Sequence, residues 1–493
     1  MTATGLFTDF YELTMAQGFF RRGMNEPCVF EMFFRRQPFG GGYAVFAGLE
    51  PFLDALSAFR FPPEDIAWLE SLNLFDRDFL DWLASFRFGG RVLAQDEGSI
   101  VFPQVPLVRI EAPLIEAQLI EGLLLNTINF QSLIATKTAR VCAATGRGAA
   151  TGSGGKSASV MEFGLRRAQG RDGALAASRA AYIGGASGTS NTLAGKEWGI
   201  PVMGTMAHSW VMSFPSELEA FRAYAERWPE SSVFLIDTYD TLKSGVQNAI
   251  IAGRELKERG KRFGVRLDSG DIHYLSVQVR KALDEAGLED AFIAVSNDLD
   301  ETIIETLVAQ GAPIDSWGVG TRMVTGGSDS SFTGVYKLAA RKGSDGAWKS
   351  VMKFSDHPEK MTNPGRKQAW RLYDEKGMAL ADLLALEEEG PPQARPQGGL
   401  RLWHPAADYR HIHLEGAFTA RPLLSPRMED GKLLAPHPPI GEIRERVQRD
   451  CATMDPSYRR LLNPHVYKVS LSSRLRDLKL SLIKEALGDE DIG

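Results

Sequence analysis

The sequence has few cysteines and no long apolar run, and each absence excludes a class of protein. Its three cysteines are far apart in 493 residues, and none belongs to a CxxC pair. This spacing excludes a readable zinc cluster and a disulfide framework. No window approaches the roughly 18 consecutive apolar residues of a membrane-spanning helix. The first residues also lack the basic and apolar stretches of a signal peptide. We therefore expect a soluble, cytoplasmic protein.

An excess of positive charge is also absent. The formal net charge is -6, from 56 basic and 62 acidic side chains. A mildly acidic chain is a poor candidate for non-specific binding to nucleic acid or to an anionic membrane. The net charge leaves room for a local basic pocket that binds an anionic small molecule.

The sequence divides into three regions of different texture. Residues 1–125 are typical of a small α+β domain, which we expect part of 345–430 to join in space. Residues 126–344 alternate short strand-like and helical runs at spacings of about 20–35 residues, as βα units require. Residues 345–493 form a C-terminal region with a Pro/Gly/Glu-rich linker near 387–399.

The central region contains eight candidate strands. Strands that alternate with helices form either a barrel or a doubly wound parallel sheet, and the number eight favours an α/β barrel. The candidates are Ser159–Leu165, Ala181–Ile183, Ile200–Met206, Val233–Asp237, Phe263–Asp268, Phe292–Ser296, Trp317–Val319 and Val335–Ala339.

Polar side chains follow six of these eight strands. In a βα barrel the catalytic groups come from the carboxyl ends of the strands. For any single Asp or Ser the alternative is that it caps the next helix, and we expect Asp298 to be such a cap. The strand-end residues are Arg166, Arg167, His208, Asp237, Thr238, Asp240, Arg266, Asp268, Ser269, Gly270, Asp271, Asn297, Asp298, Gly320, Thr321 and Arg322.

The chemistry of this set suits a phosphorylated sugar and a metal ion. Guanidinium groups match phosphate and carboxylate oxygens, although any one of the arginines could instead be a surface ion-pair partner. The turn at Gly320 and Thr321 can direct backbone N–H groups at a phosphate. Asp268 and Asp271 are candidates to hold Mg²⁺.

His208 follows a strand-like run in the sequence GTMAHS. A lone histidine is often a structural hydrogen-bonding residue. At a strand end it can also be a general base, or a nucleophile that accepts a phosphoryl group. Periodicity alone leaves these three roles open.

A Gly-rich stretch at 145–157 contains GSGGKS, which is close to a phosphate-binding P-loop. The pattern needs glycine where Ala150 stands, and a strand-like run follows where a helix is required. We interpret the stretch as a flexible insertion.

Nine collinear motifs resemble nicotinate phosphoribosyltransferases, a type II phosphoribosyltransferase family. The resemblance covers nearly the whole chain and is carried by TDFYELTMAQGFF (8–20), FEMFFRRQPFGGGYAVFAGLE (30–50), NFQSLIATKTAR (129–140), EFGLRRAQGRDG (162–173), GTMAHSWV (204–211), DTYDTLKSGVQNA (237–249), GVRLDSGDI (264–272), WGVGTRMVTG (317–326) and NPHVYKVSLSSRL (463–475). One departure is the longer connection between Arg140 and Glu162.

The resemblance implies a fold and a reaction. Members have an N-terminal α+β domain, an irregular TIM-like α/β barrel and a C-terminal extension. They convert nicotinate and phosphoribosyl pyrophosphate into nicotinate mononucleotide and pyrophosphate, with Mg²⁺ and with hydrolysis of ATP, as the entry of nicotinate into NAD salvage. They form homodimers in which the partner's N-terminal segment completes the site.

The resemblance also implies residue roles. His208 matches the histidine that ATP phosphorylates, and Tyr11 matches the aromatic residue that stacks on the pyridine ring. The other matches are Thr205 and Arg266 for nicotinate and the phosphoribosyl group, Arg166 for pyrophosphate or the nicotinate carboxylate, Asp237 and Asp268 for orienting His208 or holding ribose and metal, and Gly320 and Thr321 for the sugar 5′-phosphate.

Three alternatives remain. A sister enzyme would use nicotinamide, and its pocket would lack cationic donors for a carboxylate. An inactive binding or scaffold paralogue is disfavoured because His208, Arg266, Asp268 and Thr321 are all present. A hydrolase on a generic barrel has no recognisable nucleophile motif in its favour.

Overall fold

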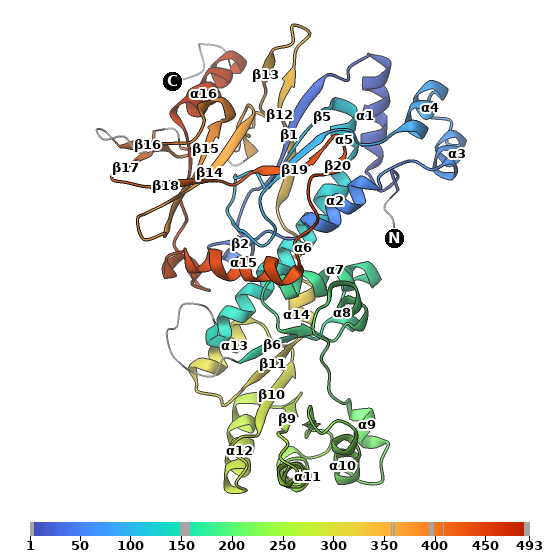
Figure 1. Ribbon diagram of the computed structural model, residues 1–493, viewed down its shortest axis with the longest axis vertical. Coiled ribbons are helices and arrows are strands. Elements are labelled where there is room, and N and C mark those ends of the chain that lie inside the picture. Colours follow the sequence, from blue (N-terminus) through green and yellow to red (C-terminus); the bar gives the residue numbers. More distant parts are fainter. Residues whose placement is uncertain are drawn as a thin grey trace. The chain divides into compact units, whose positions relative to one another are not determined.

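The computed structural model describes residues 4–147, 158–355, 357, 360–393, 399–407 and 409–487. The chain forms two compact units: unit 1 comprises Met1–Leu133 and Ser331–Gly493, and unit 2 comprises Ile134–Ser330. The chain passes from unit 1 into unit 2 within the long helix α6 (Glu121–Cys142) (Figure 1). No helix in the described part of the chain is long and apolar enough to cross a membrane.

Unit 1 is built on two antiparallel-rich sheets. The first has the order β13-β12-β1-β5-β3-β19-β20, and the second has the order β17-β16-β21-β15-β14-β18. A short pair, β2 and β4, accompanies them. The strands are β1 (Pro27–Phe34), β2 (Ala44–Val45), β3 (Arg91–Ala94), β4 (Ile100–Val101), β5 (Val108–Pro113), β12 (Gly334–Lys342), β13 (Trp348–Ser350), β14 (Lys367–Tyr373), β15 (Ala379–Leu386), β16 (Leu400–Trp403), β17 (His411–Leu414), β18 (Thr419–Pro422), β19 (Ser425–Glu429), β20 (Lys432–Leu433) and β21 (Val469–Leu471).

Helices complete unit 1. The apolar faces of α1, α2 and α4 bury side chains such as Leu13, Phe52 and Phe79 in one core with strand β1. The helices are α1 (Phe10–Arg21), α2 (Leu49–Ser57), α3 (Pro63–Ser71), α4 (Arg77–Ser85), α5 (Leu114–Leu119), α15 (Ile440–Ala452) and α16 (Ser473–Leu487).

One predicted barrel strand lies in unit 1 instead. Val335–Ala339 is not a barrel strand: it lies in β12, which pairs antiparallel with β1, so that Val335 faces Phe33 and Leu338 faces Phe30. Residues 387–399 connect β15 and β16, which belong to one sheet. A short apolar run predicts a strand without naming its partner, so the pattern could not assign Val335–Ala339 to a sheet.

Unit 2 contains a parallel sheet with the order β7-β6-β11-β10-β9-β8. All five strand pairs are parallel, and a single bridge between Thr189 and Val202 continues the pairing beyond β7. The strands are β6 (Ser159–Glu162), β7 (Gly188–Thr189), β8 (Val233–Leu235), β9 (Gly264–Leu267), β10 (Phe292–Asn297) and β11 (Ser316–Val319). The α/β class, with an irregular arrangement of parallel strands, is confirmed.

Helices separate these strands, as the βα spacing predicted (Figure 1). Central strands such as β11 are buried along their whole length because helices flank a parallel sheet. The helices are α7 (Gly170–Ile183), α8 (Thr192–Trp198), α9 (His208–Met212), α10 (Glu217–Arg227), α11 (Val246–Glu258), α12 (Ile272–Glu285), α13 (Glu301–Ala309) and α14 (Thr321–Val324).

Two further candidate strands of unit 2 were wrong. Ala181–Ile183 forms the last turn of α7, because the alanine-rich run before it continues as helix. Ile200–Met206 contributes only the bridge at Val202, and β7 takes the strand position before it. The Gly-rich residues 148–157 lie outside the described residues, and 143–147 form a π-helical turn.

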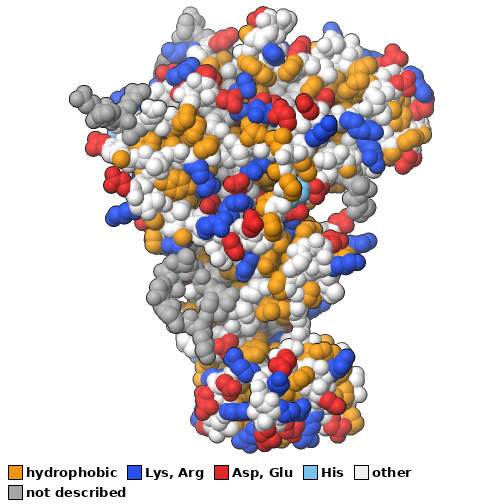
Figure 2. All heavy atoms as spheres, viewed as in Figure 1, with side chains coloured by type: hydrophobic (Ala, Val, Ile, Leu, Met, Phe, Trp, Pro, Cys, Tyr) orange, Lys and Arg blue, Asp and Glu red, His pale blue; other side chains and the backbone are white. Residues whose placement is uncertain are grey.

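The outer surface of unit 2 carries interspersed charges. Figure 2 shows basic and acidic side chains mixed over the helices that surround the sheet. Ion pairs such as Arg222–Glu255 (2.6 Å) and Arg280–Asp284 (2.7 Å) lie on this surface. Exposed pairs of this kind contribute little to stability, about 0–1 kcal/mol each.

Helix α16 of unit 1 is fixed by a buried lysine that titrates near neutral pH. The Nζ of Lys479 donates to Asn363 Oδ1 over 2.9 Å and to the carbonyl of Pro405 over 2.8 Å. Burial, with repulsion from the buried Lys367, lowers the pKa of Lys479 from 10.5 to about 8. Between these values the unfolded chain binds more protons than the folded chain.

We therefore expect the free energy of unfolding to rise as pH increases from 8 towards 10.5, by roughly 1 kcal/mol over the first pH unit. Urea unfolding of the wild type and of Lys479→Met at pH 7, 8 and 9 isolates this increment, because the variant lacks the titrating group. Equal pH slopes for the two proteins would contradict the prediction.

Candidate active site

The candidate site of unit 2 lies at one edge of the parallel sheet. Residues that directly follow strands β6, β8, β9 and β11 come together there because the carboxyl ends of parallel strands meet at one edge. The N-terminal ends of the following helices lie at the same edge. The sheet therefore brings Asp237 and Asp268 together, as the sequence predicted, and His208 approaches them from the start of α9.

His208 is the first residue of α9 and is held between two polar side chains. Its Nδ1 lies 3.1 Å from Thr238 Oγ1, and its Nε2 lies 3.8 Å from Asp268 Oδ2. The imidazole is 41% exposed, so a substrate can reach it. Its short helix is fixed through Trp210, whose indole N–H donates to the carbonyl of Ala220 in α10 over 3.1 Å.

The two carboxylates are linked through the backbone. Asp237 Oδ2 accepts hydrogen bonds from the Asp268 backbone N–H (3.0 Å) and from Ser269 Oγ (2.6 Å). Its other oxygen, Oδ1, is buried and has no hydrogen-bond partner within the described residues. Asp268 Oδ1 accepts from Ser296 Oγ at 2.5 Å. Each carboxylate therefore keeps one oxygen that accepts no hydrogen bond from the described residues.

Arg266 supplies positive charge to the same edge. Its Nη1 donates to Thr205 Oγ1, and its Nε is buried without a partner in the described chain. Burial lowers the pKa of Arg266, and the charges of Asp268 and Asp237 oppose this effect while that of Arg166 adds to it. A guanidinium remains charged at any physiological pH, so the site presents a partly desolvated cation to an anion.

The turn after β6 carries Arg166 and is fixed by a buried glutamate. Glu162 is 1% exposed; its carboxylate accepts from the Gly164 backbone N–H and from the hydroxyls of Ser178 and Thr189. These bonds hold the start of the turn, and Arg166 is exposed beyond it. Glu162 opens the motif EFGLRRAQGRDG, but nothing in the sequence around it predicts this buried role.

Gly320 and Thr321 form the turn between β11 and α14. A Cβ atom at Gly320 would lie 3.2 Å from the carbonyl oxygen of Phe163, so the two strand-end turns approach each other closely. Thr321 is the first residue of α14 and Arg322 is exposed beside it. The turn is thus at the expected edge.

Several strand-end acids cap helices instead of lining the site. Asp271 accepts from the Tyr274 backbone N–H at the start of α12, and Asp240 accepts from Leu242 and Lys243. The expectation for Asp298 was wrong, because Asp300 caps α13. Over the described ranges, no three His, Cys, Asp or Glu side chains are grouped so that they could hold a metal ion.

Tyr11 lies in unit 1, in the first turn of α1, and is 49% exposed. The next residue, Glu12, is fully buried and accepts from Gln118 Nε2 over 2.6 Å. Burial raises the pKa of Glu12 to about 7. Helix α1 is thus anchored through its buried face, while Tyr11 on the same helix is exposed to solvent.

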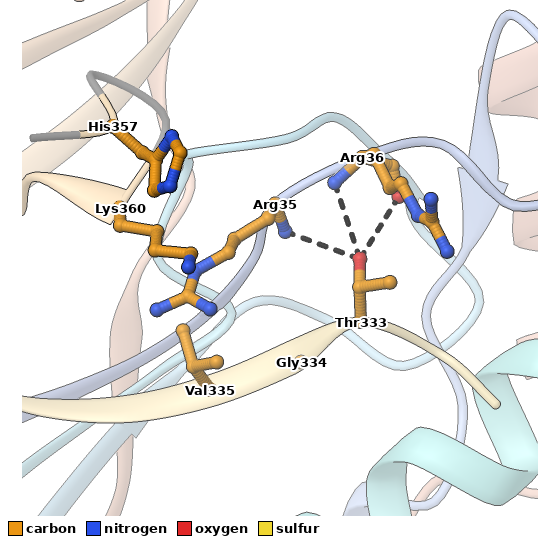
Figure 3. Close-up of a pocket in the computed structure, with 7 residues that line it drawn as sticks. All are labelled: Arg35, Arg36, Thr333, Gly334, Val335, His357 and Lys360. Atoms are coloured by element: carbon orange, nitrogen blue, oxygen red, sulfur yellow. Dashed lines mark hydrogen bonds between the residues drawn. The ribbon is translucent and has the colours of Figure 1, made fainter.

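Unit 1 also has a basic pocket of about 580 Å³, to which the sequence analysis assigned no role, although Arg35 and Arg36 lie in the motif at 30–50 (Figure 3). The side chains of Arg35, His357 and Lys360 gather on one side of it, whereas that of Arg36 turns away (Figure 3). Thr333 Oγ1 fixes the turn by accepting from the backbone N–H groups of Arg35 and Arg36. Arg35 Nε is buried without a partner in the described chain, so the pocket suits an anion.

Comparison with known proteins gives matches along the whole chain. Three family models match: the nicotinate phosphoribosyltransferase (NAPRTase) N-terminal domain at residues 6–129, the NAPRTase family at 158–324 and the C-terminal domain at 366–479. The chain is similar to nicotinate phosphoribosyltransferase from Bacillus subtilis, with 42% identity over 97% of this chain and 95% of the relative.

The human and archaeal proteins extend these matches. The chain is 36% identical to the Homo sapiens nicotinate phosphoribosyltransferase over 97% of both chains. The crystal structure of human nicotinic acid phosphoribosyltransferase matches with a TM-score of 0.82 at 34% identity, covering 96% of this chain and 99% of that one. A nicotinate-nucleotide pyrophosphorylase from Pyrococcus furiosus shares the fold, with a TM-score of 0.67 at 22% identity.

Proposed function

Because the chain belongs to the nicotinate phosphoribosyltransferase family, we propose that it makes nicotinate mononucleotide from nicotinate and phosphoribosyl pyrophosphate. The reaction is coupled to ATP through a phosphohistidine at His208. The observation that carries the proposal is the arrangement of Arg266, Asp268 and His208 at one strand edge. Such an edge offers a cation to the nicotinate carboxylate, a carboxylate to the sugar and a nucleophile to ATP.

The transfer step needs charge stabilisation and positioning, not a strong base. The bond from the ribose anomeric carbon to the pyrophosphate oxygen breaks, and a bond from that carbon to the pyridine nitrogen forms. The ribose carbon becomes electron-poor, so Asp237 and Asp268 stabilise it while the arginines stabilise the departing pyrophosphate. The pyridine nitrogen already has its lone pair, so the protein mainly aligns the two reactants and excludes water.

In the ATP step, an imidazole nitrogen of His208 attacks the γ-phosphorus. The N–P bond forms, the bond to the bridging oxygen breaks and ADP leaves; water later releases phosphate from the ring. Thr238 and Asp268 lie on opposite sides of the imidazole. One nitrogen can therefore hold its proton while the other reacts.

The residues present fit Mg²⁺ that arrives with the substrate. Mg²⁺ commonly uses one or two protein carboxylates and completes its shell with phosphate oxygens and water. Asp237 Oδ1, buried and unpartnered within the described chain, can supply one such ligand, whereas Asp268 Oδ2 faces His208. When bound, the ion would neutralise charge on pyrophosphate. The helix-capping role of Asp271 makes it a weaker candidate.

The other residue roles follow the family. We assign nicotinate to Thr205 and Arg266, pyrophosphate or the nicotinate carboxylate to Arg166, and the sugar 5′-phosphate to Gly320 and Thr321. Tyr11 stacks on the pyridine ring from the partner subunit of a homodimer. The homodimer and the cytoplasmic location stay predictions.

A competition between nicotinate and nicotinamide tests the proposal. Initial rates with phosphoribosyl pyrophosphate and Mg²⁺, with and without ATP, should favour nicotinate by at least about 100-fold in kcat/KM, because a buried cation is left unpaired by the neutral amide. A preference for nicotinamide would reassign the enzyme to its sister activity. Absence of turnover by folded protein would favour an inactive paralogue.

A further inference from the structure

The orientation of Asp268 depends on a serine that has no role in the scheme above. Ser296 Oγ donates to Asp268 Oδ1 over 2.5 Å. Because this bond occupies one carboxylate oxygen, the other oxygen, Oδ2, is the one that faces His208 Nε2 at 3.8 Å. The hydrogen bond from Ser296 thus determines which carboxylate oxygen of Asp268 faces the imidazole.

The strand register brings Ser296 to this position. Strands β9 and β10 pair in parallel, with Val295 opposite Leu267. Ser296 directly follows Val295 and Asp268 directly follows Leu267, so the two polar residues lie side by side. Ser296 is 7% exposed, and its neighbour on β11 is Gly318. A Cβ at Gly318 would approach Ser296 Cβ within 3.2 Å, so the serine is closely confined. Its hydroxyl therefore has little freedom to leave Asp268.

A fixed carboxylate matters most when the imidazole becomes positive. Attack by either ring nitrogen on phosphorus leaves positive charge on the ring, with the remaining proton on the other nitrogen. Asp268 can stabilise this charge only while Oδ2 points at the ring, and a carboxylate free to rotate would lose part of the effect. Thr238 holds the other side of the ring and cannot supply negative charge.

We propose that Ser296 is a positioning residue for phosphorylation of His208, acting through Asp268. The proposal rests on the proposed function, because it concerns the ATP step of that reaction. Ser296 makes no contact with the imidazole in this scheme. Its effect should therefore appear in the rate of phosphoryl transfer and depend on the presence of His208.

Rapid-quench labelling with [γ-³²P]ATP measures that rate. The burst amplitude reports the fraction of active sites, so the rate constant is independent of partial misfolding. Ser296→Ala should slow phosphorylation about tenfold, since it removes one charge-assisted hydrogen bond. Ser296→Thr keeps the hydroxyl and should stay within about threefold of wild type. Ser276→Ala is the matched control, because Ser276 is fully buried in unit 2 and its hydroxyl donates to the carbonyl of His273 on its own helix.

A wild-type rate constant in Ser296→Ala would overturn the proposal, as would equal losses in Ser296→Ala and Ser296→Thr. A double-mutant cycle on nucleotide formation gives a second test. In the His208→Asn background, which has no ATP step, Ser296→Ala should cost several-fold less than it costs in the wild-type background, whereas additive losses would overturn the proposal. A wild-type protein that forms no acid-labile label would instead overturn the ATP step of the proposed function, and with it the role proposed here for Ser296.

Discussion

Replacing His208 with asparagine should abolish the incorporation of phosphate from [γ-³²P]ATP and the stimulation of nucleotide synthesis by ATP. Asparagine keeps a polar side chain that can still meet Thr238, but it has no nitrogen lone pair able to form an N–P bond. Wild-type label should be lost in acid and retained in base, as expected of a phosphoramidate. Filter binding after quenching, with nucleotide formation followed in parallel, measures both effects.

The matched control is His273→Asn. His273 lies on α12 of the same unit, and its ring bonds the carbonyl of Gln310 at 3.3 Å. This variant should keep the full label and the full response to ATP. Acid-stable label in the wild type, or unchanged labelling of His208→Asn, would assign the phosphoryl group to another residue.

Replacing Arg266 with lysine should lower kcat/KM for nicotinate by roughly 100- to 1,000-fold. The guanidinium is largely desolvated and bonds Thr205, and its Nε has no partner in the described chain, so it can donate to two oxygens of a carboxylate at once. An ammonium group retains the charge but not the planar fork. Steady-state kinetics with nicotinate and nicotinamide should also show that the discrimination between them falls.

Arg254→Lys controls for the exchange of arginine for lysine. Arg254 lies exposed on α11, where its guanidinium donates to the carbonyl of Ala286 over 3.2 Å. Its variant should keep wild-type kinetics. If Arg266→Lys kept kcat/KM within about threefold of wild type, a bidentate role for Arg266 would be wrong.

Local sequence patterns predicted the strand ends well, because an apolar run and the polar residues that follow it are adjacent in the sequence. The run FGVRLD combines a buried strand with polar residues at its end, and this combination correctly located Arg266 and Asp268. The same reasoning was wrong for Ala181–Ile183, where three apolar residues are too few to separate a strand from the last turn of a helix. Helix propensity of the preceding residues decided that case.

Contacts between side chains from different strands could not be predicted from the sequence. The bond from Ser296 to Asp268 depends on the register between β9 and β10 and on two rotamers. The residue types alone do not predict such a bond, since a serine at a strand end more commonly caps the next helix. Asp240 and Asp271 follow that common pattern, which is why composition at strand ends overestimates the number of functional acids.

Unit 1 is assembled from both ends of the chain, and this connectivity has a consequence for synthesis. Strand β1 pairs with β12, so Cys28 meets Arg341 across a separation of more than 300 residues. During translation, β1 and β5 emerge long before β12, and all of unit 2 is made between them. Unit 2 is contiguous and can fold on the ribosome as it emerges. One edge of the nascent N-terminal sheet, by contrast, stays unpaired until late in synthesis, which exposes it to aggregation and gives chaperones a natural point of action.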